Sequence, residues 1–226
     1  MTPLHSPHTP DIAFWLVDID AGVEAGSSTL SEAERAQADR FHFERDARRY
    51  RASHEALRTL LSQATGVPAP ELAFFQGAFG KPGLSLRDAP HFNMSHSGGW
   101  ALIGIGGSTP IGVDIEVPRS MDDLHALAER NFTTAECEAL AASAEPQQLE
   151  TFLRCWTRKE ACLKALGSGL SVEPGVFVAG VEPGLRATHI DVGGQRCGMS
   201  VVSLALPVKA LAAVAWISPA DRHLAM

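Results

Sequence analysis

The sequence predicts a mixed α+β fold of two similar α/β lobes, each built from helices followed by short strands. Helical and then strand periodicity appear once between residues 31 and 105 and again between residues 121 and 217. With 226 residues and 45% hydrophobic content, the chain has enough apolar side chains for a substantial core. We expect a loose tail at residues 1–10, an N-terminal lobe at 11–110 and a C-terminal lobe at 111–226.

Short apolar runs bounded by glycine or proline predict the strands. They lie at residues 12–19, 72–75, 101–105, 111–117, 176–178, 187–192, 199–206 and 211–217. Pro207 and Lys209 divide the longest apolar stretch into two strands, which argues against a membrane helix.

Capping residues and periodic apolar side chains predict the helices. Two sites fit a capping box, in which the side chains at both ends of the first turn bond its backbone: Ser31 with Glu34, and Thr133 with Glu136. Further helices are predicted after a cap at Asp46, at residues 121–130, and at residues 149–166 before Gly167.

The charge and the cysteine content exclude several classes of protein. A formal net charge of −7 argues against non-specific nucleic-acid binding, which depends on basic surface. The four cysteines show no metal-binding spacing, so we expect reduced core residues in a cytoplasmic chain. Any anionic ligand must be bound by a local cluster of cations.

A pair of acids lies on the predicted strand at residues 111–117. Asp114 and Glu116 point to the same face, because strand side chains alternate. Burying such a pair is costly unless something neutralises it. Two interpretations are equally open on this pattern: an edge strand that faces water, or a metal site.

The helix at residues 149–166 carries Lys159 and Glu160 within an apolar stripe. Glu160 and Lys164 are four residues apart, which on its own is typical of a surface ion pair. The adjacent Ser95 and His96 do not indicate a hydrolase, since the sequence has no G-x-S-x-G elbow.

Four motifs occur in a recognisable order, and together they resemble one family. They are Gly80-Lys81-Pro82, Phe92-Asn93-Met94-Ser95-His96, Ile111-Gly112-Val113-Asp114-Ile115-Glu116, and the helix from Trp156 to Lys164. In this order and spacing they resemble the 4'-phosphopantetheinyl transferase superfamily, in its larger single-chain form. The arginine-bearing helix between residues 40 and 58 also fits the N-terminal part of that family.

The resemblance implies a monomer of two lobes related by a pseudo-two-fold axis, with the active site in the cleft between them. Coenzyme A is expected to bind there with Mg²⁺. The enzyme would transfer the 4'-phosphopantetheine group from coenzyme A to a serine of an acyl or peptidyl carrier protein and release 3',5'-ADP. No nucleic acid and no membrane are expected as partners.

The resemblance also assigns the site residues. The metal ligands would be Asp114, Glu116 and Glu160, a carboxylate set that suits Mg²⁺ and not zinc. Glu160 would accept the serine proton, directly or through a metal-bound water, and Lys164 would stabilise the leaving group. His96 and Lys159 are also placed near the phosphates.

The 3'-phosphate of coenzyme A needs cations of its own, because the protein is acidic. We expect Lys81 and Arg49 in this role, with a hydrogen bond from Ser95. Some family members carry lysines where this sequence has Glu34 and Gln37, and Arg35 or Arg40 would compensate. Pieces of a surface for an acidic carrier are expected at Arg119, Met121 and Arg130.

Two other functions fit part of the pattern. The same three acids would suit a Mg²⁺-dependent nucleotide pyrophosphohydrolase, which would release 4'-phosphopantetheine without a carrier. A non-catalytic coenzyme A-binding module would bind tightly without turnover, but it has no need of Asp114, Glu116, Glu160 and Lys164 together.

Overall fold

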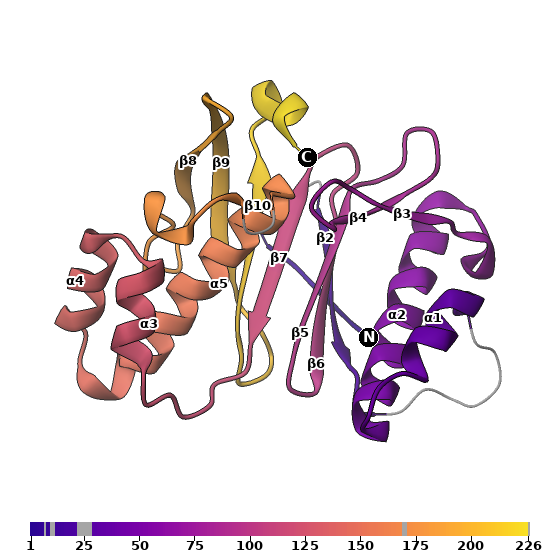
Figure 1. Ribbon diagram of the computed structural model, residues 1–226, viewed down its shortest axis with the longest axis horizontal. Coiled ribbons are helices and arrows are strands. Elements are labelled where there is room, and N and C mark those ends of the chain that lie inside the picture. Colours follow the sequence, from indigo (N-terminus) through magenta and orange to yellow (C-terminus); the bar gives the residue numbers. More distant parts are fainter. Residues whose placement is uncertain (7, 10–11, 22–28, 169–170, 226) are drawn as a thin grey trace.

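The computed structural model describes residues 1–6, 8–9, 12–21, 29–168 and 171–225 (Figure 1). The strands are β1 (Thr2–Leu4), β2 (Ala13–Asp18), β3 (Phe74–Gln76), β4 (Pro82–Leu84), β5 (Phe92–Ser97), β6 (Trp100–Ile105), β7 (Ile111–Glu116), β8 (Arg186–Val192), β9 (Gln195–Leu204) and β10 (Leu211–Ile217). The helices are α1 (Glu32–Ala38), α2 (Glu44–Thr65), α3 (Leu124–Asn131), α4 (Thr134–Ala142) and α5 (Gln148–Leu166).

Two four-stranded antiparallel sheets form the centre of the molecule. Their strand orders are β1-β2-β6-β5 and β7-β10-β9-β8, and β3 with β4 forms a separate small hairpin. Helices α1 and α2 lie on the side of the first sheet, and α3, α4 and α5 lie with the second (Figure 1). We call these two parts the N-terminal and C-terminal lobes. The mixed α+β fold class is confirmed.

The two sheets meet at their edges and share apolar packing. Strands β5 and β7 are each the edge strand of their sheet, and they lie side by side. One buried cluster includes Phe14, Leu16 and Leu102 from the first sheet with Val113 and Val214 from the second. The lobes are therefore joined by a hydrophobic core as well as by the chain.

Helix α5 lies directly on β7 because Gly112 has no side chain. A Cβ atom built at this position would lie 2.1 Å from the carbonyl oxygen of Ala161 and 2.2 Å from the backbone nitrogen of Ala165. These are backbone atoms inside a helix, so they cannot move aside as a flexible side chain would. Gly112 thus sets the distance between the helix and the strand that carries Asp114.

Both predicted capping boxes are confirmed, at Ser31 with Glu34 and at Thr133 with Glu136. The apolar stretch near the C-terminus forms the two strands β9 and β10, as its proline and lysine predict. In the described part of the chain, no helix is both long and apolar enough to cross a membrane.

Three local predictions are wrong. Residues 2–4 are not a loose tail, because they pair with β2 as a strand, while residues 7 and 10 of that predicted tail lie outside the described residues. Helix α2 begins at Glu44 with Phe43 at the N-cap, so Asp46 lies inside the first turn and does not cap it. No strand forms at the predicted residues 176–178, where Val176 is instead the last residue of a 3₁₀ turn at Pro174–Val176. The lobe boundary at residue 110 and the pseudo-two-fold relation stay predictions.

Replacing Gly112 by alanine should destabilise the protein by about 3 kcal/mol, the upper part of the range for overpacking a core. The added methyl group must push α5 away from β7. Urea denaturation of the variant, followed by circular dichroism, measures this loss. Gly184→Ala is the matched control, because nothing lies within 4 Å of a Cβ atom at Gly184. Equal midpoints for Gly112→Ala and the parent would show that the close approach is not needed.

Candidate active site

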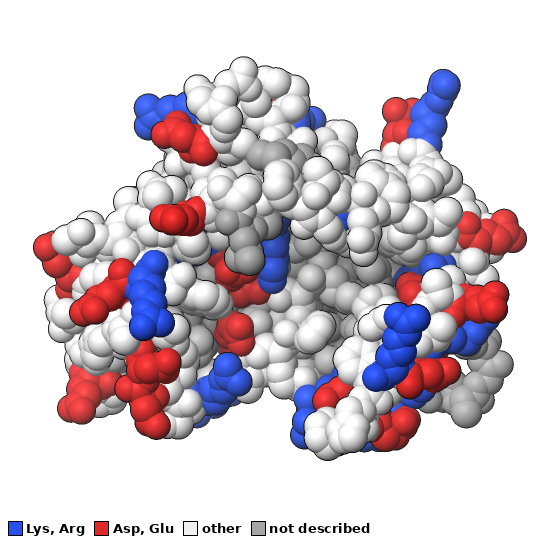
Figure 2. Space-filling model, viewed as in Figure 1, with Lys and Arg blue, Asp and Glu red and all other residues white. Residues whose placement is uncertain are grey.

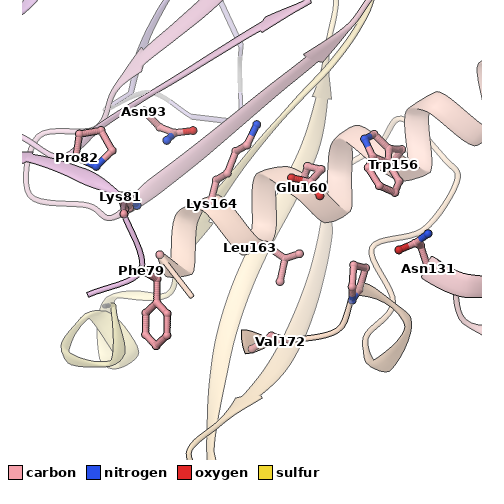
Figure 3. A pocket seen from close by; sticks show the side chains of 13 residues that line it. Phe79, Lys81, Pro82, Asn93, Asn131, Trp156, Glu160, Leu163, Lys164 and Val172 are labelled. Carbon is pink, nitrogen blue, oxygen red and sulfur yellow. The ribbon is translucent and has the colours of Figure 1, made fainter. Parts of the chain in front are cut away.

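A cavity of about 410 Å³ lies between the two lobes and is lined by both (Figure 3). The N-terminal lobe contributes the loop residues 79–82 and Asn93 of β5, and the C-terminal lobe contributes Asn131 and one face of α5. The residues of α5 at the cavity are Trp156, Glu160, Leu163 and Lys164. They share a face of the helix because they are spaced by three or four residues. The cavity therefore has an apolar wall with an acid and an amine beside each other.

Asp114 of β7 is the most deeply buried acid next to this cavity. Its Oδ1 accepts a hydrogen bond from the Ser95 hydroxyl at 2.8 Å and lies 2.5 Å from Nζ of Lys164. Nζ of Lys164 is also 3.1 Å from the Ser95 hydroxyl oxygen. The other carboxylate oxygen of Asp114, Oδ2, is buried and has no hydrogen-bond partner among the described residues. A buried carboxylate oxygen without a partner is costly, and this indicates a place for a further ligand.

The second acid of β7, Glu116, is held from the N-terminal lobe in the same way. The Ser97 hydroxyl donates to Glu116 Oε2 at 2.8 Å and accepts the backbone N–H of Val117 at 3.1 Å. Two residues before Ser95, the side-chain oxygen of Asn93 accepts the backbone N–H of Val113 at 2.8 Å. Alternate residues of β5 thus form side-chain hydrogen bonds to the edge of β7, in place of the backbone hydrogen bonds that join strands within one sheet.

The three acids lie within electrostatic reach of each other. The pKa values of Asp114, Glu116 and Glu160 are all raised, mainly because burial disfavours their charged forms. The negative charge of Asp114 adds to this rise for both glutamates, and the positive charge of Lys164 opposes it for all three. The cleft therefore concentrates negative charge that one lysine partly neutralises.

The acids offer the donor atoms that Mg²⁺ prefers, without a complete cage of protein ligands. Within the described ranges, no three His, Cys, Asp or Glu side chains are arranged to hold a metal ion by themselves. Mg²⁺ commonly binds one or two carboxylates together with waters and the phosphates of a substrate. The unpartnered Oδ2 of Asp114 is the oxygen that fits such a cation.

Lys159 is buried in the C-terminal lobe, and its predicted place beside the phosphates stays a prediction. Its Nζ pairs with Glu136 at 2.8 Å and donates to the carbonyl oxygens of Pro174 and Phe177 at 2.7 and 2.6 Å. Consecutive helix residues point about 100° apart, so Glu160 faces the cleft while Lys159 faces the interior of its lobe. Lys159 holds the segment at residues 174–177, next to a wall of the cavity.

Lys81 and Arg49, the predicted pair for a 3'-phosphate, line different cavities, and their shared role stays a prediction. Nζ of Lys81 donates to the carbonyl oxygens of Ile111 and Ala165, both at 2.9 Å, and burial lowers its pKa to about 8. Lys81 lines the cleft cavity, whereas Arg49 lines a separate one. The amine of Lys81 thus ties the loop at residues 77–81 to the start of β7 and the end of α5.

Arg49 and His96 line that separate cavity together with Phe41 and Tyr50. The guanidinium of Arg49 forms two hydrogen bonds with Asp20, at 2.7 and 2.6 Å. Desolvation and the positive charges of Lys164 and Arg49 lower the pKa of His96, which favours its neutral form. Arg35 and Arg40 were predicted to replace lysines that other family members carry, and this role stays a prediction. Arg35 donates to the carbonyl oxygen of Leu30, and Arg40 is exposed. Neither residue lines a described cavity of the N-terminal lobe.

The sequence predicted no role for Asn93 or Ser97. It predicted that Ser95 bonds the 3'-phosphate, whereas Ser95 here bonds Asp114. A signal was present, because residues 93, 95 and 97 are all polar at the period of a strand. The same strand period separates Asp114 from Glu116, so the two rows can lie opposite each other. The sequence alone does not say that β5 is the neighbour of β7.

Comparisons with known proteins follow the same division of the chain. Residues 110–192 match the family described as 4'-phosphopantetheinyl transferase superfamily, and residues 20–106 match 4'-phosphopantetheinyl transferase, N-terminal. The chain is 36% identical over 167 residues to 4'-phosphopantetheinyl transferase HetI from Nostoc sp., covering 71% of this chain and 70% of HetI. The chain belongs to the 4'-phosphopantetheinyl transferase superfamily.

Further members show the same level of similarity. The chain is 33% identical over 159 residues to 4'-phosphopantetheinyl transferase psf-1 from Bacillus pumilus, which covers 70% of this chain and 67% of psf-1. It is 32% identical over 147 residues to Sfp from Bacillus subtilis, with 64% of this chain and 63% of Sfp covered. The predicted family and the predicted type of enzyme are confirmed.

The surface of this transferase is hollowed between its lobes, and acidic and basic side chains meet in that hollow (Figure 2). Acidic side chains are also numerous over the outer part of the C-terminal lobe in this view (Figure 2). A strongly anionic ligand would approach an acidic protein here and would depend on local cations in the cleft.

Lys159→Met should destabilise the transferase by about 3–5 kcal/mol, because it leaves the buried carboxylate of Glu136 without its cation. Chemical denaturation measures the effect. The double variant Lys159→Met with Glu136→Gln should recover part of the loss, since no uncompensated charge remains. A fully stable Lys159→Met variant with lost activity would instead return Lys159 to the phosphate site.

Glu160→Gln should raise the thermal stability of the ligand-free transferase at pH 7 while it lowers activity. A pKa raised on folding means that ionisation of Glu160 costs more in the folded than in the unfolded chain. This loss of folding stability is absent below the pKa of Glu160 in the unfolded chain and grows as the pH rises through that value. Glutamine carries no charge, so the substitution removes the loss. Thermal unfolding at pH 7 and pH 4 measures this, and the gain should shrink at pH 4. Glu129→Gln, at an exposed position of α3, is the control. A lower melting temperature for Glu160→Gln at pH 7 would contradict the electrostatic account.

Proposed function

We propose that the cleft between the lobes binds coenzyme A with Mg²⁺ and transfers 4'-phosphopantetheine to a serine of an acyl or peptidyl carrier protein. The observation that carries this proposal is the unpartnered Oδ2 of the buried Asp114, beside the amine of Lys164 and in electrostatic reach of Glu160. Both lobes that line the cavity belong to one chain, so the proposed active site is complete in a monomer.

Asp114, Glu116 and Glu160 are the proposed ligands of the metal. Bound Mg²⁺ would withdraw negative charge from the pyrophosphate of coenzyme A. The cation would also offset the cost of burying three carboxylates, and for Glu116 and Glu160 the repulsion from Asp114, so metal and substrate should bind together. Lys164 contacts Asp114 directly, and we propose that its ammonium turns to the substrate phosphates once the carboxylate binds the metal.

The chemistry is a substitution at phosphorus. The serine oxygen of the carrier forms a bond to the β-phosphorus of coenzyme A, and the bond from that phosphorus to the bridging oxygen breaks. The serine proton goes to the carboxylate of Glu160, directly or through a water. The leaving group is 3',5'-ADP, and Lys164 neutralises the charge that develops on its phosphate.

The nucleotide end of coenzyme A has a second cavity available in the N-terminal lobe. This cavity of about 530 Å³ shares Pro82 and Asn93 with the cleft cavity. Its wall includes Tyr50 and His54, whose rings stack at 3.8 Å between centroids, and Phe74. Aromatic side chains suit a purine base. We propose that Arg49 and His96, at the neighbouring cavity, contribute to binding the 3'-phosphate.

The test is transfer in vitro. The protein is incubated with coenzyme A, Mg²⁺ and a panel of apo acyl and peptidyl carrier proteins, and mass spectrometry follows the carriers. We expect the mass of one phosphopantetheine group on a carrier serine, dependent on the metal. Release of 4'-phosphopantetheine without any carrier would favour a pyrophosphohydrolase, and coenzyme A binding without turnover would favour a binding module.

Asp114→Asn should lower the transfer rate by about 100-fold or more, on the scale of losing one strong electrostatic contact to a reacting centre. Asparagine keeps the shape of the side chain but removes the charge that binds the metal and Lys164. Circular dichroism checks the fold, and Asp122→Asn, at an exposed position, is the control. Full activity of Asp114→Asn would remove this residue from the metal site.

A further inference from the structure

The bond between Ser97 and Glu116 crosses from one lobe to the other and is not explained by the fold alone. Ser97 is the last residue of β5, and Glu116 is the last residue of β7. Their side chains join at 2.8 Å, from Oγ of Ser97 to Oε2 of Glu116. We propose that Ser97 is a positioning residue, which orients Glu116 as a ligand for the divalent cation. This inference rests on the proposed function.

The direction of the Ser97 hydroxyl proton is fixed by its two partners. A backbone N–H can only donate, so the bond from Val117 occupies a lone pair of the Ser97 oxygen. The hydroxyl hydrogen is then free to point at Glu116, which accepts it as a carboxylate. Ser97 therefore directs its single donor at Oε2 of Glu116.

The backbone around Ser97 is held in place as well. Gly98 follows it with a φ of 57°, in the left-handed region that glycine adopts easily. A Cβ atom at Gly98 would lie 3.2 Å from a methyl carbon of Val117, so the turn between β5 and β6 rests against the end of β7. The serine cannot drift away from Glu116 without opening this contact. Its donor is therefore preorganised.

The two acids of β7 are oriented by equivalent partners. Ser95 bonds Asp114 and Ser97 bonds Glu116, and in both pairs the serine comes 19 residues earlier. Each serine uses one oxygen of its carboxylate. In Asp114 the remaining oxygen is the unpartnered Oδ2. In Glu116 the serine bonds Oε2, so Oε1 is the oxygen that this bond does not use. Each acid thus keeps one oxygen available for a cation.

A purely structural role of Ser97 predicts something different from a positioning role. If the bond only joined the lobes, its loss would lower stability with or without metal. If it orients Glu116, its loss should weaken metal binding, because outer partners of metal ligands typically contribute about 10–100-fold in metal affinity or activity. The dependence on Mg²⁺ concentration separates these roles.

The experiment titrates Mg²⁺ into the full chain at a fixed concentration of coenzyme A and measures the thermal unfolding midpoint at each step. The transfer rate to a carrier is measured over the same Mg²⁺ range. For Ser97→Ala, the Mg²⁺ concentration at half effect should rise by about tenfold in both measurements. Ser97→Thr keeps the hydroxyl and should restore the parent value. Ser200→Ala, at a half-buried serine of β9, is the control and should not change it.

Each outcome decides the inference. A Mg²⁺ midpoint for Ser97→Ala equal to that of the parent overturns it, even if the variant is less stable. Should Ser97→Ala not fold, Ser97→Cys has nearly the same size and a weaker donor, and it should show the raised midpoint. If the parent itself transfers phosphopantetheine without any dependence on Mg²⁺, the metal site fails, and the role of Ser97 fails with it. If transfer by the parent depends on Mg²⁺ but the Mg²⁺ midpoint of Ser97→Ala equals that of the parent, only the role of Ser97 is rejected and the proposed function stands.

Discussion

The close approach of helix α5 to strand β7 at Gly112 is the constraint on which the site depends. Because no side chain separates them, the helix backbone rests on the strand backbone. The acid of β7 and the amine of α5 can then touch, as Asp114 and Lys164 do. The packing therefore determines the charge arrangement in the cleft.

The cations of α5 differ in burial and in role. Arg158 and Lys159 point into the C-terminal lobe, where Arg158 donates to the carbonyl oxygens of Ala179 and Gly184 and burial lowers its pKa to about 10. These two side chains fix the segment that follows the helix. Lys164, about one turn beyond Glu160, faces the acids instead. A cationic motif on one helix thus contributes to both the fold and the site.

The sequence was sufficient for the fold class and for most helices and strands. Periodicity and capping determine those features locally, as at Ser31 and Thr133. It was insufficient where tertiary contacts decide the partner of a side chain. Nothing in the sequence shows that Lys159 meets Glu136, or that Lys81 meets the carbonyl of Ala165, since these contacts join distant segments. A charged residue in a motif therefore does not reveal which side of its element faces a ligand.

The meeting of β5 and β7 also bears on aggregation. Each is the last strand of its sheet, and an uncovered edge strand offers unpaired backbone groups to other chains. Here each edge is covered by the other lobe, and side chains such as Asn93 occupy backbone donors of the neighbouring edge. A fragment containing one lobe alone would expose such an edge together with half of the shared core. The arrangement that forms the cleft thus also keeps these two edges from pairing with other molecules.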